Sequence, residues 1–269
     1  MIASSKKYEL SILKSILLVL GSFMSSYCLG LTIHEIGHAI ALSLAGASDI
    51  RIFVHPFSLS YYNNSSLPTD IMPFIGSMGP LFNLGCATTI ILVLWRKRNP
   101  KLLPLLMWVG IAYFSEGVSI IMNISDISIT SDWGKVIIFG GISPIILGII
   151  GVLFITLGCI LILLLLPLEN ISPHDSIWRI GLTSIGFVFY FAFSLVYVLA
   201  LDPINITGRL IALISALFLL IFITTSYKHV FHLLDRFSHT KISSASWYTV
   251  LIALGSGVAI IIIDFAFFY

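Results

Sequence analysis

Two histidines and a glutamate stand close together in the run His34-Glu35-Ile36-Gly37-His38. On an α-helix, residues four positions apart lie on the same face, so both imidazoles can reach one metal ion. Glu35 is turned about 100° from His34, so it can take a proton from a water at the metal without being a ligand. This His-Glu-x-x-His pattern predicts a water-using metal site with His34 and His38 as ligands and Glu35 as the general base.

The motif lies within a hydrophobic stretch of membrane-spanning length, from about Leu10 to Ala45. Charged and imidazole side chains are costly in a lipid bilayer, and where they occur they are usually functional. The alternative interpretation is structural, because these side chains can also make polar contacts with neighbouring helices. The spacing of the three residues favours metal binding.

The whole chain has the composition of a membrane protein. It is 58% hydrophobic and 10% charged, whereas soluble domains carry about 25% charged residues. No basic stripe with interleaved aromatic residues occurs, so no nucleic-acid partner is expected. Cys28, Cys86 and Cys159 have no metal-ligand spacing and are expected to be buried apolar residues. The predicted fold class is therefore an all-α, multi-pass integral membrane protein in the lipid bilayer.

Seven apolar segments are predicted to span the membrane, each bounded by charges, prolines or asparagines. They run approximately over Leu10–Ala45, Ile71–Trp95, Leu102–Met122, Val136–Leu166, Ile180–Leu201, Leu210–Thr225 and Trp247–Phe268. The connection 46–70 alternates in character around 50–60, which predicts a short hairpin or a membrane-dipping strand. We expect a three-helix zinc-binding core within residues 1–140, and additional transmembrane helices of unassigned role in residues 141–269.

The basic residues predict how these spans are oriented. Of the 14 Lys and Arg residues, 11 fall on one side of the membrane if the seven spans alternate in direction. By the positive-inside rule, the N-terminus is then cytoplasmic and the C-terminus lies outside. His34 lies 20 residues beyond Lys14, roughly 30 Å along a helix, so the motif approaches the outer end of its span.

A zinc hydrolase usually has three protein ligands, so a third ligand is expected at the depth of the two histidines. Asp132 fits best, because it follows the third span on the same side of the membrane; its alternative role is a carboxylate at a helix N-terminus. Asp126 is an alternative ligand. Glu116 is another, and it could instead orient substrate or make a buried polar contact. Asp264, near the end of the last span, is expected to be interfacial and not catalytic.

Two further pieces follow the His-Glu-x-x-His motif along the chain: Met78-Gly79-Pro80-Leu81-Phe82-Asn83, and the segment from Asn123 to Asp132-Trp133-Gly134-Lys135-Val136. They look like the Gly-Pro-Leu-x-Asn and Asn…Asp-Gly-Gly-Arg-Ile signatures of one family. In this order, the three pieces resemble the site-2 protease family of intramembrane zinc metalloproteases, over roughly residues 25–140. The resemblance implies that Asp132 is the third zinc ligand and that Asn83 positions the substrate backbone near the metal.

The expected function is that of an intramembrane zinc metalloprotease. One Zn²⁺, held by His34, His38 and Asp132, would serve the hydrolysis of peptide bonds in or next to the membrane-spanning segments of a membrane protein substrate. Two alternatives stay open: a non-proteolytic membrane zinc hydrolase that acts on lipids or amides, and a non-catalytic metal-binding membrane protein.

Overall fold

The computed structural model describes residues 2–48, 50–55, 61–63, 67–94, 102–125, 127–165, 177–201, 206–234 and 246–267. Five of its helices are long and apolar enough to cross a membrane. They are α1 (Ile2–Leu44), α2 (Met72–Leu94), α3 (Leu103–Ser125), α5 (Pro144–Leu165) and α9 (Trp247–Phe267). This mostly helical architecture agrees with the predicted all-α membrane protein.

Four further helices are shorter or only partly apolar: α4 (Asp132–Ile138), α6 (Ile177–Ser184), α7 (Gly186–Leu201) and α8 (Ile206–Leu234). The predicted span at 180–201 is divided between α6 and α7, and α7 has only 16 residues. In α8, the stretch Leu213–Tyr227 is apolar. Seven spans therefore stay a prediction, with five supported by the length and composition of the described helices.

The predicted fourth span, 136–166, is wrong as a single helix. The chain forms the short helix α4, leaves helical geometry after Ile138, and starts α5 at Pro144. Gly141 has a φ of +65°, in the left-handed region that favours glycine and commonly ends helices. Pro144 then opens α5, because proline suits the first turn of a helix, where its missing N–H is not needed.

The connection between α1 and α2 contains the predicted hairpin. Strands β1 (Arg51–Phe53) and β2 (Tyr61–Asn63) pair antiparallel, with Ile52 opposite Tyr62. Both strands contact α1. The short 3-10 helix η1 (Thr69–Ile71) then leads directly into α2, which starts beside the C-terminal part of α1.

Helices α3 and α5 pack through two pairs of facing glycines. A β-carbon added to Gly117 would lie 2.6 Å from the carbonyl oxygen of Gly151, and one added to Gly158 would lie 2.7 Å from that of Gly110. Within each helix the two glycines are seven residues apart, so they recur on one face. In lipid the hydrophobic effect does not drive helices together, and small residues allow the close packing that stabilises their association. Helix α3 is thereby held firmly along its length.

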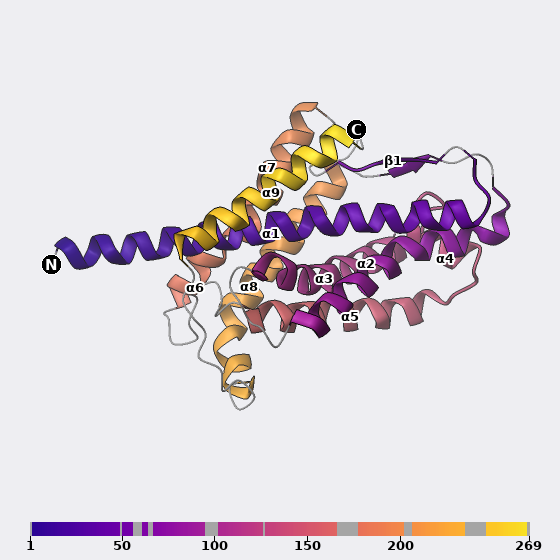
Figure 1. Cartoon of the computed structure of the whole chain (residues 1–269). Coiled ribbons are helices and arrows are strands. Elements are labelled where there is room, and N and C mark those ends of the chain that lie inside the picture. Colours follow the sequence, from indigo (N-terminus) through magenta and orange to yellow (C-terminus); the bar gives the residue numbers. More distant parts are fainter. Residues whose placement is uncertain are drawn as a thin grey trace.

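The long helix α1 is central, with α2 and α3 along it and α9 crossing beside it (Figure 1). Helices α1 and α9 run in the same direction, because residues later in α1 contact residues later in α9. Ser25 Oγ donates to the Ala253 carbonyl at 2.8 Å, and Thr32 Oγ1 donates to Asp264 Oδ1 at 2.8 Å. The first and last described helices therefore form a parallel pair.

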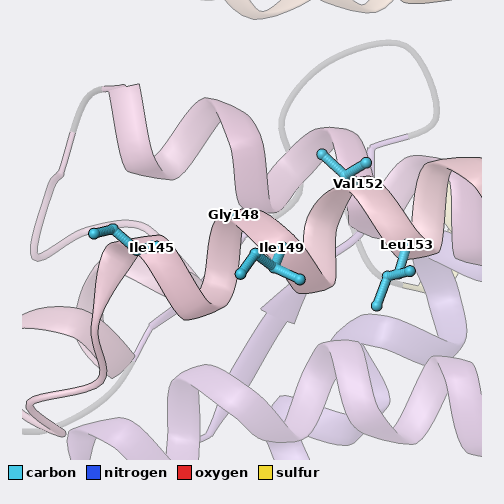
Figure 2. A pocket seen from close by; sticks show the side chains of 5 residues that line it. All are labelled: Ile145, Gly148, Ile149, Val152 and Leu153. Atoms are coloured by element: carbon cyan, nitrogen blue, oxygen red, sulfur yellow. The ribbon is translucent and has the colours of Figure 1, made fainter.

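One face of α5 is exposed and apolar. Figure 2 shows a shallow apolar depression on this helix, lined by Ile145, Gly148, Ile149, Val152 and Leu153. Four of these five are large hydrophobic side chains that are more than half exposed. In a membrane such a face contacts lipid chains, so the depression is not a candidate for polar chemistry.

Candidate metal centre

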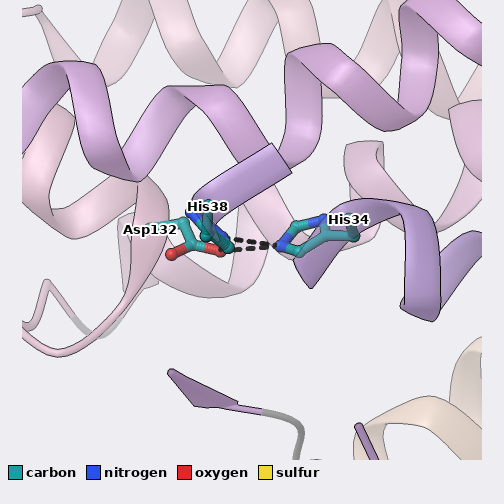
Figure 3. Close-up of side chains that lie close together, drawn as sticks. All are labelled: His34, His38 and Asp132. Carbon is teal, nitrogen blue, oxygen red and sulfur yellow. Dashed lines mark hydrogen bonds and ion pairs between the residues drawn. The ribbon is translucent and has the colours of Figure 1, made fainter. Parts of the chain in front are cut away.

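His34, His38 and Asp132 come together at one end of the helical bundle. The Nε2 atoms of the two histidines are 3.1 Å apart, and they lie 3.0 Å and 3.1 Å from Asp132 Oδ2. Figure 3 shows the two imidazoles and the carboxylate converging on one point. Among the described residues, this is the cluster of histidine, cysteine and acidic side chains that could hold a metal ion.

The other nitrogen of each imidazole has its own acceptor. His34 Nδ1 is 3.0 Å from Glu116 Oε1, and His38 Nδ1 is 2.8 Å from the carbonyl oxygen of Ile75. A backbone carbonyl can only accept, so His38 Nδ1 carries a proton, and the Glu116 carboxylate favours the same tautomer in His34. In neutral imidazoles both Nε2 atoms then present lone pairs to each other and to Asp132.

Three electron-pair donors at this spacing need a positive charge between them. In a tetrahedral zinc site with bonds of about 2.0–2.1 Å, ligand atoms are about 3.3 Å apart, close to the separations found here. Metal-bound histidines also commonly donate their second nitrogen to a carboxylate or a backbone carbonyl, as both do in this protein. The two nitrogens and the carboxylate oxygen therefore fit a metal ion in number, type and orientation.

The close approach of α1 to α2 brings His38 to the site, and glycines make it possible. A β-carbon on Gly37 would lie 2.7 Å from the Met78 carbonyl oxygen and 3.0 Å from Gly79 Cα. A β-carbon on Gly79 would overlap the imidazole of His38. These glycines therefore provide the space in which the second histidine reaches the cluster.

Asp132 is supplied by the first turn of α4. Ser131 caps this helix by accepting a hydrogen bond from Gly134 N, and α4 lies against α2, where a β-carbon on Gly76 would lie 2.5 Å from the Asp132 carbonyl oxygen. Asp132 therefore fulfils both interpretations of its sequence, a carboxylate at a helix N-terminus and a member of the cluster. Its Oδ1 lies 3.6 Å from the ammonium group of Lys135, which is mostly buried.

The charges around Asp132 keep its carboxylate ionised. Burial by itself raises the pKa of Asp132, but its hydrogen bonds and charge interactions with His34 and His38 outweigh that effect. They hold the pKa well below its usual range. A metal ion and a proton would compete for the same imidazole nitrogen atoms.

Glu35 lies beside the cluster and is not one of its three members. Its side chain is 5% exposed, and it is close enough to His34, His38 and Asp132 for charge interactions with all three. Its Oε2 atom is buried and has no hydrogen-bond partner within the described part of the chain. A buried carboxylate oxygen without a partner next to a metal-binding cluster is available to take up a proton.

The alternatives for the third ligand have different outcomes. Glu116 is 4% exposed and contacts His34 on the side away from Asp132, so it makes a buried polar contact with a member of the cluster. Asp126 lies outside the described residues. Asp132 is the acidic residue that the structure brings to both histidines.

Asn83 is buried on α2, and its Oδ1 accepts a hydrogen bond of 2.9 Å from Trp108 Nε1 on α3. This contact between two helices is the ordinary role of an amide in a membrane protein. The substrate-positioning role implied by the resemblance stays a prediction, and it would use the amide nitrogen of the side chain.

Asp264 is buried within the helical bundle, and its expected interfacial depth in the membrane stays a prediction. Its side chain is fully buried between α9 and α1, with Oδ1 bonded to Thr32. Thr32 also donates to the Cys28 carbonyl. The composition of the last span gave no hint of this contact, because the partner lies 232 residues away in the chain.

Sequence reasoning missed two features of the site. The Ile75 carbonyl is a backbone group and leaves no trace in the sequence. Gly79 belongs to the run that looks like the Gly-Pro-Leu-x-Asn signature, and the structure gives it a steric role beside His38. Comparison of the chain with protein-family models, curated proteins and solved structures found no match.

Proposed function

We propose that this protein is an intramembrane zinc metalloprotease related to the site-2 protease family. His34, His38 and Asp132 would hold the zinc ion, and Glu35 would be the general base. The observation that carries the proposal is the convergence of three metal-binding atoms within 3.1 Å of one another, with the carboxylate of Glu35 beside them. Nitrogen and carboxylate ligands of this kind suit zinc.

When bound, a zinc ion supplies Lewis-acid chemistry: it acidifies a water molecule and polarises a carbonyl group. Glu35 Oε2 would accept a proton from water as the water oxygen forms a bond to the carbonyl carbon of a peptide. The same carboxyl group would then give this proton to the leaving nitrogen as the carbon–nitrogen bond breaks. Water is consumed, and one carboxylate and one amine are released.

The position of the site favours a membrane protein as substrate. Its members come from the C-terminal half of α1 and the first turn of α4, so the cluster lies toward the ends of membrane-spanning helices. The side chains of His34 and Asp132 are 17% and 23% exposed, while that of His38 is 1% exposed. Substrate and water would therefore approach from the side of His34 and Asp132. A locally unwound segment would present its carbonyl there, with Asn83 positioning its backbone.

We also propose seven spans with a cytoplasmic N-terminus, which would turn the metal centre toward the outer face. The distribution of Lys and Arg supports this orientation. The parallel arrangement of α1 and α9 supports an odd number of spans, because two helices that cross in the same direction enclose an odd number of intervening crossings.

The decisive experiment compares wild-type protein with Glu35→Gln, which keeps the shape of the side chain and removes the base. Each would be expressed in the same cells, and the membrane proteins cleaved would be identified from their new N-terminal peptides. We expect Glu35-dependent cleavage, with equal zinc content in the two purified proteins. Asp70→Asn, at an exposed acid in η1, is the matched control and should retain cleavage.

Other outcomes would separate the alternatives. Products that persist in Glu35→Gln would remove this residue from the mechanism. Unchanged membrane proteins but altered lipid or amide products would point to the non-proteolytic hydrolase. Bound zinc without any product that depends on Glu35 would indicate a non-catalytic metal-binding protein.

A further inference from the structure

We propose that Glu116 is a positioning residue for the metal site: its carboxylate holds the imidazole of His34 with Nε2 directed at the metal. Glu116 Oε1 lies 3.0 Å from His34 Nδ1, on the opposite side of the ring from the cluster. The inference rests on the proposed zinc site, and it concerns metal binding rather than the cleavage reaction.

The two histidines are held in different ways. His38 donates to the backbone carbonyl of Ile75, which every residue at that position would supply. His34 instead depends on a side chain from α3, a helix that contributes no ligand to the cluster. His34 is also the more exposed of the two, so it has more room to rotate. Of the two contacts that orient the histidines, only the one made by Glu116 can therefore be removed by substituting a side chain.

The backbone that carries Glu116 is well fixed. The next residue, Gly117, packs against Gly151 and Ile155 of α5, with no space for a β-carbon. Because successive helix residues point about 100° apart, Glu116 is directed away from this contact and toward α1. A carboxylate on a rigid helix can hold an imidazole more accurately than one on a loop.

Glu116 is costly to the fold, which argues against a purely structural role. It is 4% exposed in an apolar helix, and its Oε2 has no hydrogen-bond partner among the residues that the structure covers. A buried acid with one unpaired oxygen destabilises a membrane helix relative to an apolar side chain. Its benefit is expected at the metal, because a carboxylate behind a ligand fixes the tautomer and strengthens the nitrogen as a donor. Loss of such a partner typically lowers metal affinity about 10–100-fold.

The test uses the full chain in detergent, stripped of metal, as wild type, Glu116→Gln and Glu116→Leu. Zinc affinity is measured by competition with a chelating dye, the ligand field by the absorption spectrum of the cobalt(II) form, and stability by thermal unfolding in chelator. We expect Glu116→Leu to lose about 10–100-fold in zinc affinity and to change the cobalt spectrum. Without metal it should melt no lower than wild type. Glu116→Gln keeps an acceptor and should lose less affinity.

Asp264→Asn is the matched control, because it also removes a buried acid beside α1, one that is bonded to Thr32 and is not a member of the cluster. It should leave zinc affinity and the cobalt spectrum unchanged. Unchanged affinity in Glu116→Leu would overturn the inference. So would a loss of affinity that appears only together with a lower melting temperature in chelator, in both Glu116 variants. A wild-type protein that binds zinc but cleaves nothing would end the protease proposal alone, and one that takes up no zinc would end both.

Discussion

The imidazole of His38 on α1 occupies the space that a side chain in place of Gly79 on α2 would fill, so this position has room only for glycine. The overlap involves Nε2, the atom that would bind the metal. Gly79→Ala should therefore displace His38 and lower zinc affinity by at least about tenfold, with a smaller effect on helix stability.

Gly85→Ala is the control for that substitution. It lies on the same helix, nothing is within 4 Å of a β-carbon there, and alanine favours helices over glycine by about 1 kcal/mol. Zinc titration and thermal unfolding of both variants would check the prediction. Wild-type affinity in Gly79→Ala would show that His38 can bind from another position.

Asp132→Ala should abolish stoichiometric zinc binding, because it removes one of three ligand atoms and leaves the two imidazoles without a counter-charge. The ammonium group of Lys135, 3.6 Å from Asp132, would then lie near the histidines and oppose a cation further. Metal analysis of purified protein measures this directly, with Asp70→Ala as a control acid. Full zinc content in Asp132→Ala, with a loss in Asp126→Ala, would transfer the ligand role to Asp126.

Removal of the metal should destabilise the protein through mass action. A ligand at 100 times its dissociation constant stabilises the folded state by about 2.7 kcal/mol, so chelation should lower the melting temperature of the wild type. In His34→Ala the same treatment should have little effect, because this variant lacks a ligand from the start. Equal shifts in the two proteins would mean that the chelator acts elsewhere.

Gly117→Ala tests the packing of α3 on α5. Its β-carbon would meet the Gly151 carbonyl oxygen at 2.6 Å, and backbone cannot rotate out of the way. We expect a loss of about 1–3 kcal/mol in unfolding free energy, as for other overpacked sites. Gly148→Ala, whose β-carbon would meet only Ile124 at 3.6 Å, should be close to neutral in the same thermal unfolding assay.

The sequence predicted the parts of this structure that depend on local spacing. His34 and His38 share a helix face because four residues make about one turn. The apolar lengths of α2, α3 and α9 predict their bounds within a few residues, whereas α1 begins eight residues before the predicted Leu10. Asp132 was selected by its depth, and the structure brings it to both histidines.

What could not be predicted depends on contacts between distant segments. The chain is apolar both before and after the break between α4 and α5, so hydrophobicity alone could not locate this break. The partners of Glu116 and Asp264 lie 82 and 232 residues away, and a single sequence carries no record of such pairings. For Glu116, three roles were open from the sequence, and the structure shows a polar contact with His34.

The pairing of α1 with α9 bears on the order in which the protein assembles. All three members of the cluster, together with Glu35 and Glu116, have been synthesised once the ribosome has passed α4. The partner of Ser25 and Thr32 on α1 is α9, which is synthesised more than a hundred residues after α4. The candidate metal centre could therefore form on an unfinished bundle, and the contact of Asp264 with Thr32 would form late in assembly.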